Sequence, residues 1–261
     1  MTPVLVFDIE TVPDVAGIRT LQGLSDKVSD DEVAELAFHQ RRQQTGGDFL
    51  PLHLQRVVAI SCALRSGDTW KVWSIGKADD PEAALIQRFF DGIDKFTPQL
   101  VSWNGQGFDA QVLHYRGMIH GVVADKYWDQ GDDDRDFKYN NYISRYHPRH
   151  LDLMDLLALY QARANAPLDA LAKLCGFPGK LGMDGSAVWG AYRAGRIEEI
   201  RDYCETDVVN TYLVYLRFQK MRGVLVADAH AREERLVRET LGGMAQAHWR
   251  DYLAAWAPPA P

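Results

Sequence analysis

The sequence predicts an α/β protein in which a mixed β-sheet is covered by helices on both faces. Three observations support this fold class. An apolar run rich in β-branched residues opens the chain, a tight turn joins two further strand-like segments, and short apolar runs then alternate with segments of helical spacing. Strands interleaved with helices favour a sheet whose two faces both pack against helices.

The first predicted strand covers residues 3–10 (PVLVFDIE), and its almost continuous apolar character is typical of a buried central strand. Residues 14–55 are polar and mixed. We interpret them as an insertion with at least one helix, because Ser29 and Glu32 have the spacing of a capping box. A hairpin follows, in which an SGD turn at 66–68 joins the strands RVVAISCAL and TWKVWSIG.

The middle of the chain continues the alternation of helices and strands. A helix is expected over PEAALIQRFFDGIDKF with Pro81 in its first turn, followed by the strand PQLVSWNG and a helix that begins at FDAQVLHYRGMIHG. Residues 121–149 are irregular, and the acidic run at 132–134 predicts a solvated loop. The next expected elements are a short strand entering a helix (RHLDLMDLLALYQARA), the helix PLDALAKLCGF and the glycine-rich loop PGKLGMDGS.

Two long helices are predicted after that loop, over about 196–221 and about 228–256. We therefore expect one domain over residues 1–225 that includes the helical insertion at 14–55. A C-terminal helical extension at 226–256 is expected to pack on that domain, and the tail at 257–261 (APPAP) is expected to be disordered.

Composition and charge limit the classes of protein that fit. The chain has 261 residues, of which 46% are hydrophobic, so a sizeable core is possible and general disorder is excluded. No apolar run reaches the roughly 18 residues that a membrane span needs, and the start lacks the basic region of a signal peptide. Cys62, Cys175 and Cys204 have no zinc-binding spacing, so we expect reduced thiols and a cytoplasmic location.

The formal net charge is −7, from 29 basic and 36 acidic residues. This balance argues against a protein that holds DNA by bulk electrostatic attraction. It is compatible with an enzyme that meets phosphate groups through metal ions, because cations between clustered acids would remove their repulsion toward a polyanion.

Two acids of the first strand are the first candidate site residues. Asp8 and Glu10 lie two positions apart, so they project from the same face of a strand whose other members are apolar. Burying adjacent carboxylates is unfavourable unless a cation compensates them. The alternative is that the pair lies at the exposed end of the strand.

Two further acids come from distant segments. Asp207 falls inside the apolar stripe of its helix, one turn after Tyr203, so it is either a metal ligand or the partner of an unidentified arginine. Asp109 follows the WNGQGF turn, where it is either a helix cap or part of a site built at the end of a strand.

Three motifs in this order, FDIET, WNGQGFD and YCETD, resemble the DEDD superfamily of 3'-5' exonucleases. YCETD fits the YxxxD form of the tyrosine branch, because position 202 is Asp where the histidine branch has His. HLDLMD and PGKLGMDGS resemble the stand-alone bacterial group of predicted exonucleases related to the proofreading domain of family B DNA polymerases. The resemblance covers about residues 4–221.

The resemblance implies an RNase H-like fold of the DnaQ-like exonuclease type, with a mixed five-stranded sheet, flanking helices and here extra C-terminal helices. It also implies that four carboxylates hold two divalent ions, Mg²⁺ or Mn²⁺, for phosphodiester hydrolysis. Asp8 would bridge both ions, with Glu10 and Asp207 completing one ion site and Asp109 acting partly through water at the other. Tyr203 would orient the attacking water.

Several secondary candidates are weaker. Asn104, Phe108 and Lys180 are possible substrate contacts. For Lys180 the sequence favours an ordinary exposed lysine, and for Phe108, as for Trp103, it favours core packing over stacking on a base. Structural roles are favoured for four other residues: His150, Asp152, Asp155 and Asp184.

The expected partner is nucleic acid, with single-stranded DNA favoured in repair or end processing and RNA possible. One alternative function is an exoribonuclease that matures RNA. Another is a catalytically silent nucleic-acid-binding module on the same fold. The sequence does not set the oligomeric state.

Overall fold

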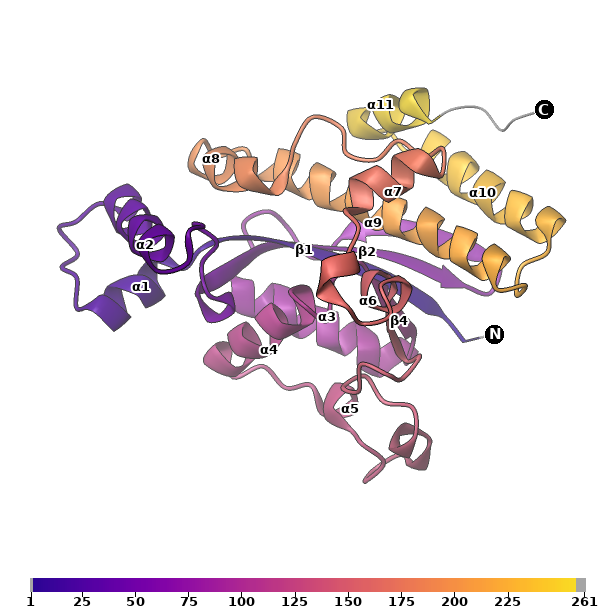
Figure 1. Ribbon diagram of the computed structural model, residues 1–261, viewed down its shortest axis with the longest axis horizontal. Helices are drawn as coiled ribbons and strands as arrows, with labels where there is room; N and C mark the ends of the chain where they lie inside the picture. The colour runs from indigo at the N-terminus through magenta and orange to yellow at the C-terminus, as the bar shows by residue number, and fades with distance from the viewer. Residues whose placement is uncertain (1, 257–261) are drawn as a thin grey trace.

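The computed structural model describes residues 2–256, which form a five-stranded mixed sheet between two layers of helices (Figure 1). The strands are β1 (Val4–Pro13), β2 (Gln55–Ser66), β3 (Thr69–Ser74), β4 (Gln99–Ser102) and β5 (His150–Asp152). Their order is β3-β2-β1-β4-β5, with β2 antiparallel to β1 and β3, and with β4 and β5 parallel to β1. The α/β prediction is confirmed, and the sheet is consistent with the RNase H-like fold.

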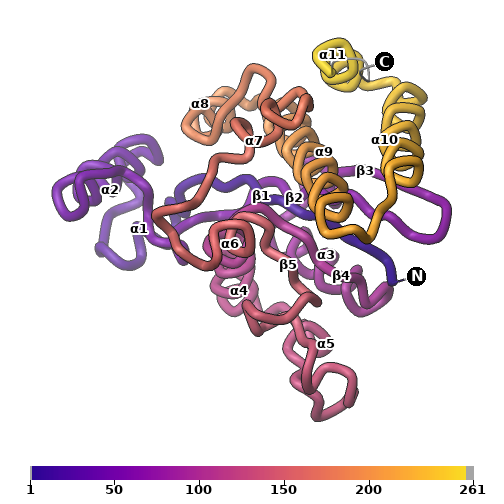
Figure 2. The backbone as a smooth tube through the Cα atoms, turned by 45° about the vertical axis from the view of Figure 1, so that its right-hand side comes forward, coloured from indigo at the N-terminus to yellow at the C-terminus, as the bar shows by residue number. Residues whose placement is uncertain are grey.

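The helices divide between the two faces of the sheet (Figure 2). Helices α3 (Glu82–Phe96) and α4 (Asp109–His120) cover one face. The other face carries α7 (Leu168–Leu174), α9 (Ile197–Met221), α10 (Ala227–Gly242) and α11 (Ala247–Ala255). The remaining helices are α1 (Val15–Gln22), α2 (Asp30–Thr45), α5 (Asp125–Trp128), α6 (Leu153–Leu157) and α8 (Val188–Arg193).

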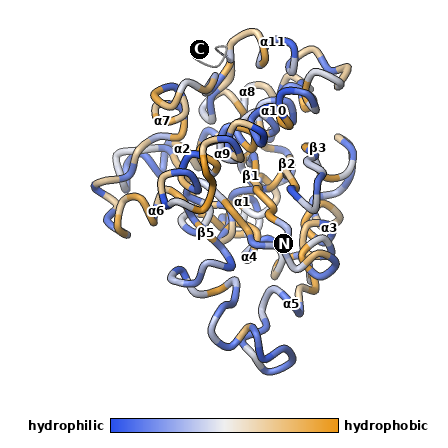
Figure 3. The backbone as a smooth tube through the Cα atoms, turned by 90° about the vertical axis from the view of Figure 1, so that its right-hand side faces the viewer, coloured by the Kyte–Doolittle hydropathy of each residue, from blue (hydrophilic) through white to orange (hydrophobic). Residues whose placement is uncertain are grey.

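The central strand β1 separates the two cores by the alternation of its side chains. Leu5, Phe7 and Ile9 are buried in the cluster formed with α3 and α4. Val6 is buried in the cluster formed with α9, α10 and α11. Because residues two apart in a strand share a face, Asp8 and Glu10 lie on the α9 side of the sheet. Figure 3 shows the apolar character of this central part of the chain.

Residues between β1 and β2 form a helical hairpin at one end of the molecule (Figure 1). The capping box at Ser29 and Glu32 is present at the start of α2. Two helices form here, α1 and α2, and they bury a small core of their own around Ile18, Val33 and Leu50.

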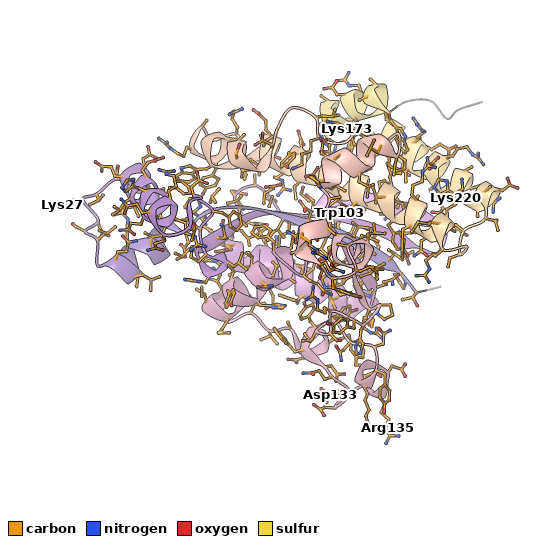
Figure 4. All side chains as sticks on the ribbon, viewed as in Figure 1. Lys27, Trp103, Asp133, Arg135, Lys173 and Lys220 are labelled. Atoms are coloured by element: carbon orange, nitrogen blue, oxygen red, sulfur yellow. The ribbon has the colours of Figure 1, made fainter. Side chains whose placement is uncertain are left out.

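The segment 121–149 contains the short helix α5 and then irregular chain. The acidic run at 132–134 is exposed, as expected for a solvated loop. Its backbone is ordered by Asp129, whose carboxylate accepts hydrogen bonds from the amides of Gly131 and Asp134 at 2.8 and 2.9 Å. Asp133 and Arg135 lie at the tip of this segment and point away from the sheet (Figure 4).

Two expectations about helix ends are wrong. The single helix expected over 228–256 is two helices, α10 and α11. The first ends at the pair Gly242 and Gly243, because glycine is a poor helix former. The helix after β5 ends at Leu157, and Leu159 and Tyr160 then adopt left-handed φ angles of 52° and 59°. The predicted disordered tail at 257–261 lies outside the described residues. Among residues 2–256, no helix has the length and apolar character to cross a membrane.

Candidate active site

The acids of β1 lie where this strand continues past its neighbour. β4 pairs with β1 only over Val4 to Val6, so the next part of β1 has no strand on that side. The amide of Ile9 is exposed to this gap and donates a 3.0 Å hydrogen bond to Asp109 Oδ1. The first residue of α4 is therefore anchored to the backbone between Asp8 and Glu10.

Helix α9 brings the fourth acid over the same stretch of β1. The thiol of Cys204 donates to the backbone oxygen of Asp8 at 3.4 Å and lies 3.5 Å from Asp8 Oδ2. This contact fixes the position of α9 along the strand, with Tyr203 and Asp207 in neighbouring positions. The structure thus brings together Asp8, Glu10, Asp109, Tyr203 and Asp207 from three distant segments.

These carboxylates are withdrawn from solvent. Glu10, Asp109 and Asp207 are only 8%, 3% and 6% exposed, and Asp8 is partly buried. Burial and then repulsion from Asp109, Glu10 and Asp207 raise the pKa of Asp8 well above its ordinary value. Burial also raises the pKa of Asp109 to about 7, although the Ile9 amide opposes the shift. Without cations the cluster therefore resists full ionisation.

The donor set fits divalent cations. All four acids offer hard carboxylate oxygens, which Mg²⁺ and Mn²⁺ prefer. Oδ1 of Asp207 is buried and has no hydrogen-bond partner among residues 2–256. An unpartnered buried carboxylate oxygen in a cluster of like charges is the arrangement that a bound cation would stabilise.

Lys180 lies inside the site, which contradicts the expectation of an ordinary exposed lysine. Its ammonium donates a hydrogen bond to the hydroxyl of Tyr203 and lies 3.6 Å from Asp207 Oδ2. Burial and the nearby acids raise the pKa of Tyr203, so its phenol stays neutral and is suited to hydrogen bonding, not to proton abstraction. The Asp207 carboxylate thus has a partly exposed lysine as its cationic neighbour, and no arginine is paired with it among the described residues.

The loop that carries Lys180 is held by a buried amide. Asn210 Oδ1 accepts from the backbone amide of Gly179 at 3.2 Å, and Asn210 Nδ2 donates to the Gly179 carbonyl at 2.9 Å. The hydroxyl of Tyr252 in α11 donates to the same Oδ1 at 2.8 Å. Asp169 accepts from the Lys180 amide at 2.7 Å. These long-range contacts place Lys180, and single-sequence patterns do not reveal them.

The WNGQG loop is held by Asp152. Its carboxylate caps α6, as expected, and also accepts hydrogen bonds from the amides of Asn104 and Gln106 at 3.0 and 2.9 Å. Asn104 has a left-handed φ of 65°, and a Cβ on Gly105 would lie 2.3 Å from Ser102 Oγ. The loop therefore has one compact path from β4 to Asp109.

Other minor candidates have structural contacts. His150 is buried, and its Nε2 lies 2.9 Å from Ser102 Oγ. Asp155 lies in the first turn of α6 and pairs with Arg145. Asp184 accepts from the Ser186 amide at 2.9 Å in a short turn.

Two hollows open beside the carboxylates. The first, of about 430 Å³, is lined by Asp8, Asn104, Lys180 and Asp207 among others. The second, of about 500 Å³, begins at Glu10 and is lined by aromatic side chains, including Phe49, Phe108 and Trp189. Phe108 is partly buried and its ring centroid lies 5.6 Å from that of Phe49. Trp103 is also partly buried and lines the first hollow.

A comparison with protein families identifies the fold that carries this site. The model of a family described as a predicted 3'-5' exonuclease related to the exonuclease domain of PolB matches residues 47–256. The chain belongs to this exonuclease family. A search of curated proteins gave no significant match.

The range matched by the family model includes Asp109, Tyr203 and Asp207 but begins after β1. Asp8 and Glu10 therefore join the candidate site through the sheet geometry and not through the matched range. The hydrogen bond from the Ile9 amide to Asp109 and the contact of Cys204 with Asp8 are the observations that unite the two sets of acids.

The sequence alone did not predict that Cys204 lies at the acidic cluster. Its thiol, Asp8 and Glu10 offer three atoms within 4.8 Å of one another. Cys204 lies within the YCETD motif and on the inward stripe of its helix, which indicates that it faces the site. A buried cysteine that only packs in the core would occupy the same kind of position, so the sequence does not distinguish the two roles. The three cysteines are free thiols, and Cys62 and Cys204 are buried.

Proposed function

We propose that this protein is a metal-dependent 3'-5' exonuclease that releases nucleoside 5'-monophosphates from the 3' end of nucleic acid, with single-stranded DNA favoured. The observation that carries the proposal is the meeting of four mutually repelling carboxylates, three buried and one partly buried, from three segments beside the neutral phenol of Tyr203. A repair or end-processing reaction on DNA would use this activity.

Each residue has a distinct task in this proposal. Asp8, Glu10, Asp109 and Asp207 would hold two Mg²⁺ or Mn²⁺ ions, which supply Lewis acidity and lower the pKa of a bound water. The Tyr203 hydroxyl would orient the water that attacks phosphorus by a hydrogen bond. The water oxygen would bond to phosphorus as the P–O3' bond breaks. The shortened strand would keep its 3' oxygen as a protonated 3'-hydroxyl, and the terminal nucleotide would leave as a 5'-monophosphate.

Lys180 would contact a phosphate oxygen of the substrate. Its ammonium lies beside Asp207 and lines the same hollow as Asp8, so a phosphate that enters this hollow comes within reach of it. Asn104 lines that hollow as well and Phe108 lines the second, so both are proposed as substrate contacts.

The experiment is digestion of 5'-labelled single-stranded DNA with Mn²⁺ or Mg²⁺. We expect stepwise shortening with release of mononucleotides, and a block when the 3' end is modified. Asp8→Ala and Asp207→Asn should each lower the rate by at least about 100-fold, because each removes a charge that stabilises the reacting centre. Asp132→Asn, which changes an exposed carboxylate of the acidic loop, is the matched control and should keep full activity.

Parallel digestion of RNA separates the alternatives. Shortening of RNA alone would replace the DNA substrate with an exoribonuclease, since only a site that accommodates the 2'-hydroxyl can act on RNA. Binding of either polymer without release of mononucleotides under any of these conditions would support the silent module and overturn the exonuclease proposal.

A further inference from the structure

A basic and aromatic segment lies between α5 and β5 and lines a third hollow, of about 470 Å³, with Tyr142, Ile143 and Arg145. Residues 137–149 (FKYNNYISRYHPR) contain Lys138, Arg145 and Arg149 and no acidic residue, in a chain whose net charge is −7. Two of its rings face solvent, since Tyr139 and Tyr146 are 78% and 70% exposed. Large exposed rings among cations are unfavourable for packing and are typical of surfaces that bind single-stranded nucleic acid.

Tyr146 and Arg145 of this segment form one local cluster with Tyr160, which follows α6. The Tyr146 and Tyr160 ring centroids lie 5.0 Å apart with an interplanar angle of 71°, and the Arg145 guanidinium lies 5.2 Å from the Tyr160 centroid. Arg145 also pairs with Asp155, so its position is fixed from two sides. This cluster holds a positive charge and two rings in place before any ligand binds.

Backbone strain supports the position of Tyr160. Leu159 and Tyr160 are consecutive non-glycine residues with left-handed φ angles of 52° and 59°. Such conformations are unfavourable for these residue types and persist where the surrounding structure requires them. Leu159 is 72% exposed, so burial of its own side chain does not account for the strain.

Two hollows with shared lining residues lie between Arg145 of this cluster and the carboxylates. A hollow of about 470 Å³ is lined by Arg145, Gln106, Asn104 and Asn165 among others. Asn104 and Asn165 also line the hollow of about 430 Å³ that contains Asp8 and Asp207. The two hollows therefore adjoin at these two asparagines.

We propose that Arg145, Tyr146 and Tyr160 form an upstream track that binds the single-stranded part of the substrate behind its 3' end. The direction of the strand rests on the proposed exonuclease function. Bases would stack on the Tyr146 and Tyr160 rings irrespective of sequence, and Arg145 would exchange Asp155 for a backbone phosphate. The Arg145 guanidinium, once it has exchanged Asp155 for phosphate, would attract the polyanion at a position away from the acidic cluster.

The test compares a long and a short substrate with the double variant Arg145→Ala/Tyr146→Ala. Binding of a labelled oligonucleotide of about 12 nucleotides, as DNA and as RNA, is measured by fluorescence anisotropy in EDTA. We expect at least about a tenfold loss of affinity for the polymer that wild-type protein binds. With Mn²⁺, kcat/KM for the oligonucleotide should fall similarly, and that for a dinucleotide should stay unchanged because it does not reach the track.

Two further variants make the comparison specific. Tyr146→Trp keeps a stacking ring and should retain wild-type affinity. Lys95→Ala/Phe96→Ala removes another exposed cation and ring, 5.1 Å apart, near the opposite end of β4, and should change nothing. Melting temperatures check that each variant is folded.

The outcomes separate the two proposals. Unchanged oligonucleotide binding in Arg145→Ala/Tyr146→Ala, or no binding by wild-type protein, would overturn the track and leave the exonuclease proposal standing. An equal loss of dinucleotide cleavage would also overturn it, because the effect would then lie at the carboxylates. Track-dependent binding by a protein that cleaves neither substrate would support the track and overturn the exonuclease.

Discussion

Asp109 combines two tasks in one carboxylate. Oδ1 accepts the Ile9 amide that would otherwise be unpaired in the gap beside β1, and the same group belongs to the acidic cluster. Burial raises its pKa to about 7 from 3.8, so ionising it in the cation-free protein costs free energy of folding. The hydrogen bond from the Ile9 amide stabilises the local backbone, whereas the negative charge on the buried Asp109 carboxylate destabilises the folded state.

Asp109→Asn separates these two contributions. The amide oxygen can still accept the Ile9 hydrogen bond, but the charge is gone. An acid with a raised folded-state pKa loses stability as pH rises from its unfolded value to about 7. In EDTA at pH 8 we therefore expect the variant to be more stable than wild type by roughly 2–4 kcal/mol, while it loses nuclease activity.

Urea denaturation at pH 8 and at pH 4 measures the effect. The difference should become small near pH 4, because the wild-type carboxyl is then protonated in the folded state and only partly ionised in the unfolded state. A variant that is less stable than wild type at pH 8 would show that the charge of Asp109 is compensated by groups other than a bound cation.

At the scale of elements, α9 is the helix on which the site depends, and α11 holds it from outside. His248 of α11 lies between two acids of α9, with Nδ1 3.0 Å from Asp202 and Nε2 3.2 Å from Glu205. Glu205 in turn accepts a 2.7 Å hydrogen bond from Ser74 of β3. Burial lowers the pKa of His248, but the two carboxylates outweigh it and raise the pKa to about 9.

His248→Gln tests this contact between α9 and α11. A histidine whose folded-state pKa is raised contributes stability that is complete below its unfolded pKa of 6.5 and is lost as pH passes about 9. We expect the variant to lose about 1–3 kcal/mol at pH 6 and much less at pH 10.

Thermal or urea unfolding at the two pH values provides the measurement. His39→Gln, which changes an exposed histidine of α2, is the control and should behave like wild type at both. A loss for His248→Gln that is equal at pH 6 and pH 10 would mean that the side chain acts by packing and not by charge.

At the scale of the whole molecule, the buried acids link folding to cation binding. A ligand that binds only the folded state stabilises it, by about 2.7 kcal/mol when its concentration is 100 times its Kd. We expect Mn²⁺ to raise the Tm of wild-type protein and EDTA to reverse the rise. Asp8→Ala should abolish most of the shift, because it removes the carboxylate that the other three acids all repel.

Differential scanning fluorimetry across a Mn²⁺ titration makes this measurement without any substrate. The Asp132→Asn control should shift as wild type does. A Tm rise of the same size in Asp8→Ala would place the cations at another part of the protein.

Local patterns in the sequence were sufficient for much of the fold. Strand alternation predicted the shared face of Asp8 and Glu10, and the Ser29–Glu32 spacing predicted the start of α2. Other features depend on contacts between distant residues. Lys180 is positioned by hydrogen bonds from its loop to Asn210 and Asp169. The end of α6 is followed by left-handed φ angles at Leu159 and Tyr160, which these residue types do not predict. Gly242 and Gly243 mark the end of α10, although helical spacing on both sides of them predicts one continuous helix.

The early end of β4 has a consequence for protein engineering. If β4 paired with β1 for about two more residues, the Ile9 amide would donate to a backbone carbonyl of β4. Asp109 would then lose the hydrogen bond that holds its carboxylate beside β1. A redesign that completes the sheet would improve its regularity and dismantle the acid cluster at the same time. Any graft of this site onto another scaffold must therefore reproduce a truncated strand, and not merely the identities of the acids.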